Sequence, residues 1–418
     1  MTPKTPRDAA ATIARKLASA GHLAYFAGGC VRDELLGLQP TDYDIATDAS
    51  PDRIRSLFNR TALVGAAFGV VLVRELGHTI EVATFRADGP YSDRRHPDHV
   101  TFSDPRADAL RRDFTINALF LDPSSQPHST RQHVIDFVGG LDDLDRRIIR
   151  AVGNPDERLA EDHLRALRAV RFAARFNFTI DPATLDALRR NASHLVGVSR
   201  ERIGEEIRRI LTHHARARAI ALLAETGLES PVLQEPTSTA PLNHLVLLDH
   251  NASYPLSLAA WALDRHGLNL APETIARQWR LALVLSNEDR DAFVQHLELA
   301  AHLRSEWATA TTAQLKRWAM HPCFNGSLAL VATFPDLQAA ILSDLDRLRA
   351  TPTGLAPPPF IDGNTLIQAG FTPGPGFRLV LDQVYDLQLE STITHFEQAL
   401  AKARELAAQF GVQQSRPE

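Results

Sequence analysis

The sequence is poor in cysteine and contains no long apolar run. Two cysteines, Cys30 and Cys323, are present among 418 residues, which is too few for a disulfide framework and typical of a reducing compartment. No stretch of about 18 or more apolar residues occurs, so no membrane-spanning helix is expected. The N-terminal stretch lacks the apolar centre of a secretory signal. These absences predict a cytoplasmic protein without a membrane partner, and they leave the oligomeric state open.

Lysine is scarce and arginine is abundant. The chain has 4 Lys, 41 Arg and a net charge of −5, and this total argues weakly against nucleic-acid binding. From Arg146 to Arg218, however, 16 Arg, no Lys and 9 acidic residues give a local charge of +7. Electrostatic binding to phosphate depends on such a local patch rather than on the total charge. The sequence therefore predicts one basic segment in an acidic chain.

A glycine pair near the N-terminus follows a predicted strand over 23–27. Gly28 and Gly29 let the backbone approach a bulky anion, and the helix expected after them points its first amides at that anion. Arg32 lies in the first turn of this helix and is suited to a bidentate phosphate contact. This pattern predicts a phosphate site, although a Gly-Gly pair alone is more often only a turn.

Acidic residues follow the glycine pair. Asp42 and Asp44 are two residues apart, so on a strand both carboxylates face the same side, as binding of two magnesium ions requires. An isolated Asp-x-Asp is otherwise a common solvated loop. Glu81 interrupts the apolar run 80–83, where an acid is costly unless it has a cation or metal partner. A Glu on the solvated face of an edge strand remains the alternative for Glu81.

The order GGCVRD, LLG and DYD resembles the opening motif of the class II tRNA nucleotidyltransferases. This family includes CCA-adding enzymes and bacterial poly(A) polymerases, and it belongs to the polymerase-beta-like superfamily. The resemblance implies an α+β fold with an N-terminal nucleotidyltransferase head that contains a mixed β-sheet. The implied parts are the head over 1–145, a helical neck over 146–218, a helical body over 219–350 and a helical tail over 351–418.

Two further stretches are similar to motifs of the same family. The segment 111–119, RRDFTINAL, contains Arg112, which can bind a triphosphate oxygen, and Asn117, which can bond a ribose hydroxyl or its own backbone; its ordinary explanation is a capped helix start. The segment 136–144 is expected to be structural. The resemblance implies that Gly28, Gly29, Arg32 and Arg112 hold the triphosphate. It also implies that Asp42 and Asp44 bind Mg²⁺ and that Glu81 is a third active-site carboxylate.

A polar stripe is expected on a helix that contains the segment EDHLRALRAVR. Asp162, Arg165 and Arg168 are spaced at i, i+3 and i+6, with Arg171 one step further, and a salt-bridged solvent face is the ordinary explanation. The stripe resembles the family's fourth motif. The resemblance implies that Asp162 and Arg165 read the base, while Arg168 and Arg171 hold the nucleotide. Cytosine and adenine both offer an amine beside an acceptor nitrogen, which suits such a pair.

The remaining segments carry fewer residues with a predicted function. The segment 199–207 resembles a fifth motif, in which we expect Ser199 to cap a helix that supports the base-reading helix. The segment 87–108 is expected to be a long flexible loop, either one that helps to switch between nucleotides or a plain connection. The chain has no His-Asp dipeptide, so the phosphohydrolase module of some relatives is not expected.

The predicted function is CCA addition. C and A from CTP and ATP would be added to the 3′ end of tRNA without a template, with Mg²⁺ as cofactor and release of pyrophosphate. The tRNA acceptor arm would bind the basic neck. The tract 64–70 favours this form over a poly(A) polymerase, an A-adding enzyme or a CC-adding enzyme. A non-catalytic RNA-binding module and an enzyme that modifies a protein or small molecule remain alternatives from other classes.

Overall fold

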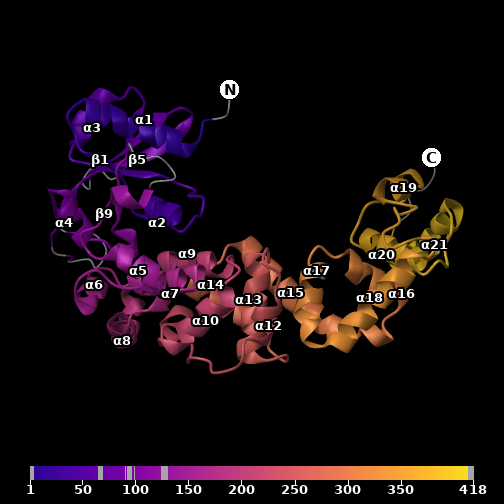
Figure 1. Cartoon of the computed structure of the whole chain (residues 1–418). Coiled ribbons are helices and arrows are strands. Elements are labelled where there is room, and N and C mark those ends of the chain that lie inside the picture. Colours follow the sequence, from indigo (N-terminus) through magenta and orange to yellow (C-terminus); the bar gives the residue numbers. More distant parts are fainter. Residues whose placement is uncertain are drawn as a thin grey trace. The chain divides into compact units, whose positions relative to one another are not determined.

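The computed structural model describes residues 4–64, 69–89, 91, 97, 99–123 and 130–412. Its contacts divide the chain into two compact units (Figure 1). One unit comprises residues up to 239 together with 282–284, and the other comprises 240–281 together with the rest from 285. The finer division into head, neck, body and tail stays a prediction. None of the described helices is long and apolar enough to cross a bilayer.

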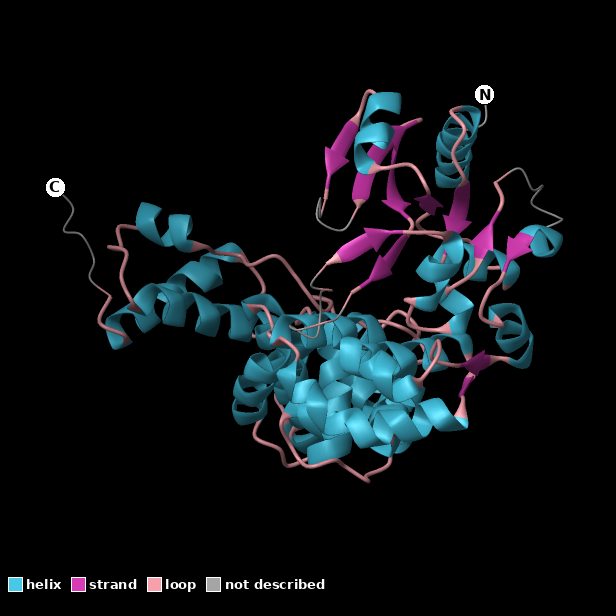
Figure 2. Ribbon diagram, turned by 90° about the vertical axis from the view of Figure 1, so that its left-hand side faces the viewer, coloured by secondary structure: helices cyan, strands magenta, loops and turns pink. Residues whose placement is uncertain are grey.

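The first unit opens with a seven-stranded sheet in the order β3-β4-β5-β2-β1-β8-β9. Strands β2 and β5 pair in parallel, and the other neighbouring strands pair antiparallel. The mixed sheet that the sequence predicted is thus confirmed, and Figure 2 shows the strands gathered in one part of a mostly helical chain. The strands are β1 (Ala24–Ala27), β2 (Asp44–Thr47), β3 (Thr61–Leu63), β4 (Val70–Glu75), β5 (His78–Thr84), β8 (Phe120–Leu121) and β9 (Val134–Ile135).

Apolar side chains on both faces hold this sheet in place. One face packs against α1 (Pro6–Ser19) and α3 (Pro51–Leu57), with Phe26, Ile45 and Val82 fully buried. Helix α1 begins where Thr5 and Asp8 form a capping box, so two of its free amides are satisfied. The opposite face carries a smaller cluster that includes Phe85 and Phe120, whose rings meet edge to face at 5.9 Å.

The functional segments converge on one edge of the sheet because of the strand directions. Strand β1 ends at Ala27, beside the start of its antiparallel neighbour β2 at Asp44. Glu81 of β5 is the register partner of Asp44, since β2 and β5 run parallel. Next to β1, the 3-10 turn Thr115–Asn117 leads into β8. Segments that are almost ninety residues apart in sequence are therefore neighbours at this edge.

The prediction of a long loop over 87–108 is partly wrong. Strands β6 (Arg86–Asp88) and β7 (Val100–Phe102) pair antiparallel, and α4 (Pro105–Leu110) follows with Asp104 as its N-cap. Residues 90, 92–96 and 98 lie outside the described residues, as do 65–68 of the tract predicted to mark the CCA-adding form. The polar composition of the segment concealed the short hairpin because each strand has only three residues.

The predicted single helix that carries Asp162 and the arginines is also wrong. Helix α6 (Pro155–Glu161) ends before Asp162, whose backbone is extended with φ −151° and ψ 104°. Helix α7 (Arg165–Phe176) begins three residues later. The acid and the arginines therefore come from two separate elements. The other helices of this unit are α2 (Gly29–Leu35), α5 (Gly140–Arg146), α8 (Pro182–Asn191), α9 (Arg200–Leu211), α10 (Arg216–Glu225) and α11 (Glu229–Leu233).

The second unit is helical in its described residues. Trp261 and Trp279 are fully buried and their ring centroids are 5.0 Å apart, while Trp318 is only half-buried. A separate apolar cluster over 361–407 packs the last three helices together. The helices that lie at least in part in this unit are α12 (Asn243–Leu247), α13 (Tyr254–His266), α14 (Pro272–Leu283), α15 (Asn287–Ser305), α16 (Thr312–Met320), α17 (Phe324–Leu330), α18 (Pro335–Arg349), α19 (Gly363–Gln368), α20 (Gly376–Leu389) and α21 (Phe396–Gln409).

Candidate active site

A cleft of about 640 Å³ in the first unit brings the predicted site residues together. Every one of the twelve predicted residues except Glu81 lines it. The lining residues from the prediction are Gly28, Gly29, Arg32, Asp42, Asp44, Arg112, Asn117, Asp162, Arg165, Arg168 and Arg171. Residues from the sheet edge and from helices α7 and α9 thus share one cavity, with polar and charged side chains on most of its wall.

The first glycine of the pair, Gly28, is needed for the close approach of a side chain. Gly28 has φ +73°, and a Cβ at this position would lie 2.6 Å from Nη1 of Arg112. The Gly28 amide donates to the Leu119 carbonyl at 2.9 Å, which fixes the turn against the segment before β8. Only glycine fits this conformation and this contact. The turn therefore lets Arg112 lie directly against the backbone at the cleft.

The acid pair lies at the mouth of the cleft. Asp44 is the first residue of β2, and Asp42 precedes the strand, so the predicted strand spacing does not extend to Asp42. Asp42, Asp44 and Glu81 keep part of their surface in solvent, while neighbouring protein atoms crowd the carboxylate of Asp44. Loss of surrounding water, followed by repulsion from Glu81, raises the pKa of Asp44 to about 6, although Arg112 opposes the shift. Glu81 lies beside Asp44 on the neighbouring strand but outside the cleft lining.

The acid pair differs from the other carboxylates of the cleft. Asp33, Asp113, Asp162 and Glu206 each form an ion pair with an arginine. In contrast, no ion pair joins Asp42 or Asp44 to any described residue. Two crowded carboxylates without a cation fit a divalent metal ion, which takes one or two carboxylates and completes its shell with substrate phosphates. The described residues contain no group of three or more His, Cys, Asp or Glu arranged to hold a metal without such a substrate.

Arg32 is buried and its donors are held by the protein. Nε and Nη2 donate to Asp33 Oδ1 at 2.8 and 2.6 Å, and Nη1 donates to the Asn117 side-chain oxygen. The guanidinium also lies over the ring of Phe176 at 4.6 Å. Burial lowers the pKa of Arg32, and Asp33 opposes this shift. The predicted phosphate ligand is thus preorganised by an acid, and it faces the cleft as a rigid group.

Asn117 does not bond its own backbone, which is one of the two contacts that the sequence suggested for it. Its side-chain nitrogen donates to Asp113 Oδ1 at 3.0 Å, and its oxygen accepts from Arg32. Asp113 also accepts from Arg168 Nε at 2.8 Å and from the Phe114 amide at 2.8 Å. Burial opposes ionisation of Asp113, but Arg168 and the bond from Asn117 hold its pKa at about 2. This network joins the sheet edge to helix α7.

Arg112 is oriented by a buried acid of helix α4. Its Nε and Nη2 donate to Asp108 Oδ2 at 3.2 and 3.0 Å, and its Nη1 donates to the Asn117 carbonyl at 3.0 Å. Arg111 donates to the other oxygen of Asp108 at 2.8 and 2.6 Å. Although burial raises the pKa of Asp108, the two guanidinium groups lower it overall. A buried carboxylate therefore positions two neighbouring arginines at the cleft.

Asp162 and Arg165 line the same cleft but do not pair with each other. Nη2 and Nη1 of Arg202 donate to Asp162 at 2.7 and 3.2 Å, while the Leu164 amide donates to Asp162 Oδ1 at 3.1 Å. Arg165 instead donates to Glu161, and to the Arg158 carbonyl at 2.8 Å. Each proposed base-reading group is thus fixed by its own partner, which leaves its remaining donor or acceptor capacity for a ligand.

Helix α7 presents its arginines along the cleft. Arg171 Nε donates to the buried Glu206 at 2.7 Å, and the guanidinium lies over the Phe172 ring at 4.4 Å. Arg168 lies over the same ring at 5.3 Å. The charged lining residues that were not predicted are Asp33, Arg111, Asp113, Arg175, Arg202, Glu206 and Arg209.

The sequence contained a signal for some of these residues. Arg168, Arg171 and Arg175 recur at i, i+3 and i+7, and Arg202, Glu206 and Arg209 recur at i, i+4 and i+7, so each set marks one helix face.

The segments 136–144 and 199–207 make the structural contacts that were expected of them, with one exception. Asp136 accepts hydrogen bonds from four consecutive backbone amides over 138–141, and Asp143 accepts from Thr115 Oγ1 at 2.7 Å. A Cβ at Gly140 would lie 2.2 Å from the Thr115 carbonyl, so the close approach needs glycine. The exception is Ser199, which precedes α9 but makes no side-chain capping bond.

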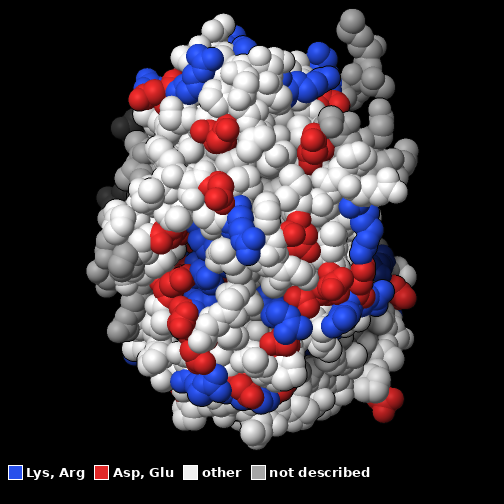
Figure 3. All heavy atoms as spheres, turned by 60° about the vertical axis from the view of Figure 1, so that its left-hand side comes forward, with Lys and Arg blue, Asp and Glu red and all other residues white. Residues whose placement is uncertain are grey.

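Charges of both signs lie close together on the surface. Figure 3 shows Lys and Arg side chains beside Asp and Glu on the face that it presents, in agreement with the many arginine–acid pairs of this unit. The predicted basic segment is therefore partly neutralised by its own acids. Those arginines that line the cleft are therefore oriented by neighbouring acids.

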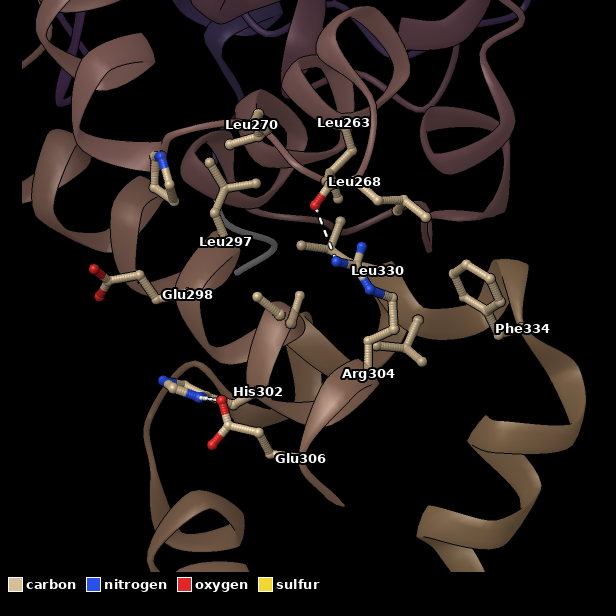
Figure 4. A pocket seen from close by; sticks show the side chains of 14 residues that line it. Leu263, Leu268, Leu270, Leu297, Glu298, His302, Arg304, Glu306, Leu330 and Phe334 are labelled. Atoms are coloured by element: carbon tan, nitrogen blue, oxygen red, sulfur yellow. Dashed lines mark hydrogen bonds and ion pairs between the residues drawn. The ribbon is translucent and has the colours of Figure 1, made fainter. Parts of the chain in front are cut away.

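A separate cavity of about 280 Å³ in the second unit has a different lining (Figure 4). Leucines line much of it, including Leu263, Leu297 and Leu330. At its rim Arg304 donates to the Leu268 carbonyl at 3.1 Å, and a further pair joins the rim residues His302 and Glu306. Of its two lining acids, Glu298 and Glu306, the second pairs with His302, and no glycine is among the described lining residues, so the cavity lacks the features of the first cleft.

Comparison with known proteins defines the class. The family model "Poly A polymerase head domain" matches residues 24–150, and the model "Probable RNA and SrmB-binding site of polymerase A" matches 177–238. The class is therefore that of nucleotidyltransferases with a poly(A) polymerase type head. A CCA-adding enzyme of Levilactobacillus brevis is 35% identical over 389 residues, covering 90% of this chain and 91% of that protein. The chain belongs to the family of CCA-adding enzymes.

Solved structures agree with this assignment. The CCA-adding enzyme of Bacillus stearothermophilus in complex with CTP is 28% identical, with a TM-score of 0.76 over 97% of this chain and 100% of that one. The CCA-adding enzyme of Thermotoga maritima complexed with tRNA is 20% identical, with a TM-score of 0.66 over 96% of this chain and 94% of that one, and it shares the fold. The predicted α+β fold and family are thus confirmed.

Proposed function

We propose that this chain adds C and A from CTP and ATP to the 3′ end of tRNA without a template. The observation that carries the proposal is that two unpaired carboxylates, Asp42 and Asp44, share one cleft with a separately anchored acid and arginine, Asp162 and Arg165. The similarity to CCA-adding enzymes supports it. In the reaction the 3′-oxygen of the RNA bonds to the α-phosphorus, the bond to the β-phosphate oxygen breaks, and pyrophosphate and a proton are released.

The carboxylates at the sheet edge form the proposed metal site. Asp42 and Asp44 would hold Mg²⁺, and Glu81 acts as a third active-site acid beside Asp44. When bound, Mg²⁺ lowers the pKa of the attacking hydroxyl and neutralises charge on the phosphate oxygens. The pKa of Asp44 is raised first by loss of surrounding water and then by repulsion from Glu81 and Asp42, and a bound cation would relieve that repulsion.

The nucleotide groups are divided between the two sides of the cleft. Gly28, Gly29, Arg32 and Arg112 would hold the triphosphate, since the turn brings Arg112 against the backbone and both arginines are rigidly placed. Asp162 accepts from the exocyclic amine of cytosine or adenine, and Arg165 donates to the adjacent acceptor. Arg168, Arg171 and Asn117 would support the bound nucleotide. A site of this kind rejects uracil and guanine because they leave its polar groups unpaired.

The remaining parts of the proposal concern the partner and the compartment. The tRNA acceptor arm would contact the basic neck over 146–218 through its phosphates. Cys30 and Cys323 are free thiols, which fits the reducing cytoplasm where we expect this chain to act.

The proposal is tested by measuring pyrophosphate release. The chain is supplied with CTP, ATP and a tRNA transcript that lacks CCA, with and without Mg²⁺. We expect release that requires Mg²⁺ and a free 3′-hydroxyl, and none with a transcript that ends in a 3′-deoxynucleotide. Release that is unaffected by removal of the RNA would contradict the proposal.

A further inference from the structure

A second cavity adjoins the nucleotide cleft at the acid pair. It has a volume of about 520 Å³, and it lies in the first unit. It shares four lining residues with the cleft: Asp42, Arg171, Arg175 and Arg209. Asp42 is the one acid among the described residues that line it. The two cavities therefore meet at a carboxylate that we place in the metal site.

The lining of this cavity suits a nucleotide that carries a phosphate. Arg175 and Arg209 have side chains that are 37% and 57% exposed, so their remaining donors can reach a ligand. Ala174, Ile210 and Ala215 supply apolar wall for a ribose and a base. Burial, followed by repulsion from His214 and the nearby arginines, lowers the pKa of His213 in the cavity wall to about 4.

The protein pairs of these two arginines are incomplete. Arg175 makes one contact with Asp33, at 3.4 Å, and Arg209 donates one bond to Glu206, at 2.9 Å. By contrast, Arg32 and Arg112 each place three nitrogens on protein acceptors. A guanidinium has five N–H donors, so Arg175 and Arg209 keep most of theirs for a further partner.

Transfer of a nucleotide needs two substrates on opposite sides of the acid pair. The triphosphate occupies one side, so the attacking 3′-hydroxyl must approach from the other side, within reach of the same carboxylates. We propose that the adjoining cavity holds the 3′-terminal nucleotide of the RNA, with Arg175 and Arg209 bound to the phosphate of its last internucleotide linkage. This inference rests on the proposed function and assigns positioning residues for its second substrate.

The test neutralises that phosphate chemically. A tRNA ending before CCA is prepared with either a normal or a methylphosphonate last linkage, and KM and kcat for CMP addition are measured. For the wild-type chain we expect the uncharged linkage to raise the KM for RNA about tenfold, as loss of a charge-assisted contact predicts. The variants Arg175→Ala and Arg209→Ala should raise the KM for normal RNA by a similar factor, and should then respond less than about twofold to the methylphosphonate.

Two controls make the result specific. Arg189→Ala removes an arginine of similar exposure on α8 that pairs with Asp186 and Glu225, and it should respond to the methylphosphonate as the wild-type chain does. The KM for CTP should change less than about twofold in both test variants. The inference would be overturned if the substitution and the methylphosphonate raised the KM for RNA by independent factors that multiply. It would also be overturned if the substitutions changed only the KM for CTP. Either result would leave the proposed function intact. Failure of the wild-type chain to extend normal RNA would instead refute the proposed function.

Discussion

Asp162 is held in the cleft by Arg202, which lies forty residues further along the chain. The two side chains form a bidentate pair with distances of 2.7 and 3.2 Å. The pair fixes an acid that stands in extended backbone between two helices, where helix geometry gives it no support. A base-reading acid needs a fixed direction, because specificity depends on unpaired groups being costly. Helix α9 therefore positions the group that we assign to base choice.

A double-mutant cycle on this pair tests that assignment. Asp162→Ala should lower discrimination between CTP and UTP about a hundredfold, because the acceptor for the exocyclic amine is lost. Arg202→Ala should lower it about tenfold, and the double variant should resemble Asp162→Ala, since Arg202 acts through Asp162. Rates of CMP and UMP addition give these values. As a control, Glu157→Ala removes an exposed acid of α6 and should leave discrimination between CTP and UTP unchanged. Additive effects of Asp162→Ala and Arg202→Ala in the double variant would contradict the account.

Replacement of either metal carboxylate should stop transfer without loss of RNA binding. Asp42→Asn and Asp44→Asn keep the side-chain shape but reduce the charge that holds Mg²⁺. We expect kcat to fall at least about a thousandfold, which corresponds to roughly 4 kcal/mol of lost transition-state stabilisation. The Kd for tRNA, measured by fluorescence anisotropy, should change less than about threefold. Asp52→Asn, at a side chain that is 95% exposed, is the matched control and should keep full activity. Full activity of Asp42→Asn or Asp44→Asn would contradict the metal assignment.

Two glycines with positive φ allow the effect of backbone strain to be distinguished from the effect of a side-chain clash. Gly28 and Gly37 have φ of +73° and +70°, but only at Gly28 would a Cβ meet Arg112. Both Ala variants should lose at least about 1 kcal/mol of unfolding free energy, because a positive φ strains a residue that carries a Cβ. Only Gly28→Ala should also raise the KM for CTP, by about tenfold, because Arg112 is displaced. Equal kinetics in the two variants would show that the position of Arg112 is unimportant.

Because Asp113 is buried and ionised, we expect the free energy of unfolding to depend on pH at low pH. Its folded pKa of about 2 lies below its ordinary value of 3.8, so its ionised form stabilises the fold above about pH 4, and this contribution is lost as pH falls through about 2. The free energy of urea unfolding should be compared between the wild-type chain and Asp113→Asn. We expect the difference to shrink by about 1 kcal/mol from pH 6 to pH 3. A difference that stays constant or grows over this range would show that Asp113 is not ionised in the network.

The sheet and its functional edge were predictable because their signals are local. The glycine turn follows its strand directly, and Asp44 starts the next one, so the chain order alone places both at one edge. The register of Glu81 against Asp44 needs the parallel pairing of β2 and β5, which connects segments far apart in sequence. The resemblance to a family implied that Glu81 lies beside the Asp pair, whereas the sequence pattern alone left a Glu on the solvated face of an edge strand as an equal alternative.

The break between α6 and α7 was not predictable from the same signals. Residues 161–171 keep a helical spacing and contain neither Pro nor Gly, so local propensity favours one continuous helix. The break is stabilised by bonds that the spacing does not reveal: the Leu164 amide donates to Asp162, and Arg202 holds the same acid from α9. For the same reason the pairing of Arg171 with Glu206, thirty-five residues apart, escaped sequence reasoning.

The most direct test of the central claim is to sequence the ends that the chain produces. Four tRNA transcripts, ending before CCA, after C, after CC and after CCA, are each incubated with CTP, ATP, UTP, GTP or all four together. We predict that CTP extends the first two transcripts, that ATP extends the third by one residue, and that the fourth stays unchanged. Long A tracts, addition of A alone or CC alone, or incorporation of U and G at comparable rates would contradict the account.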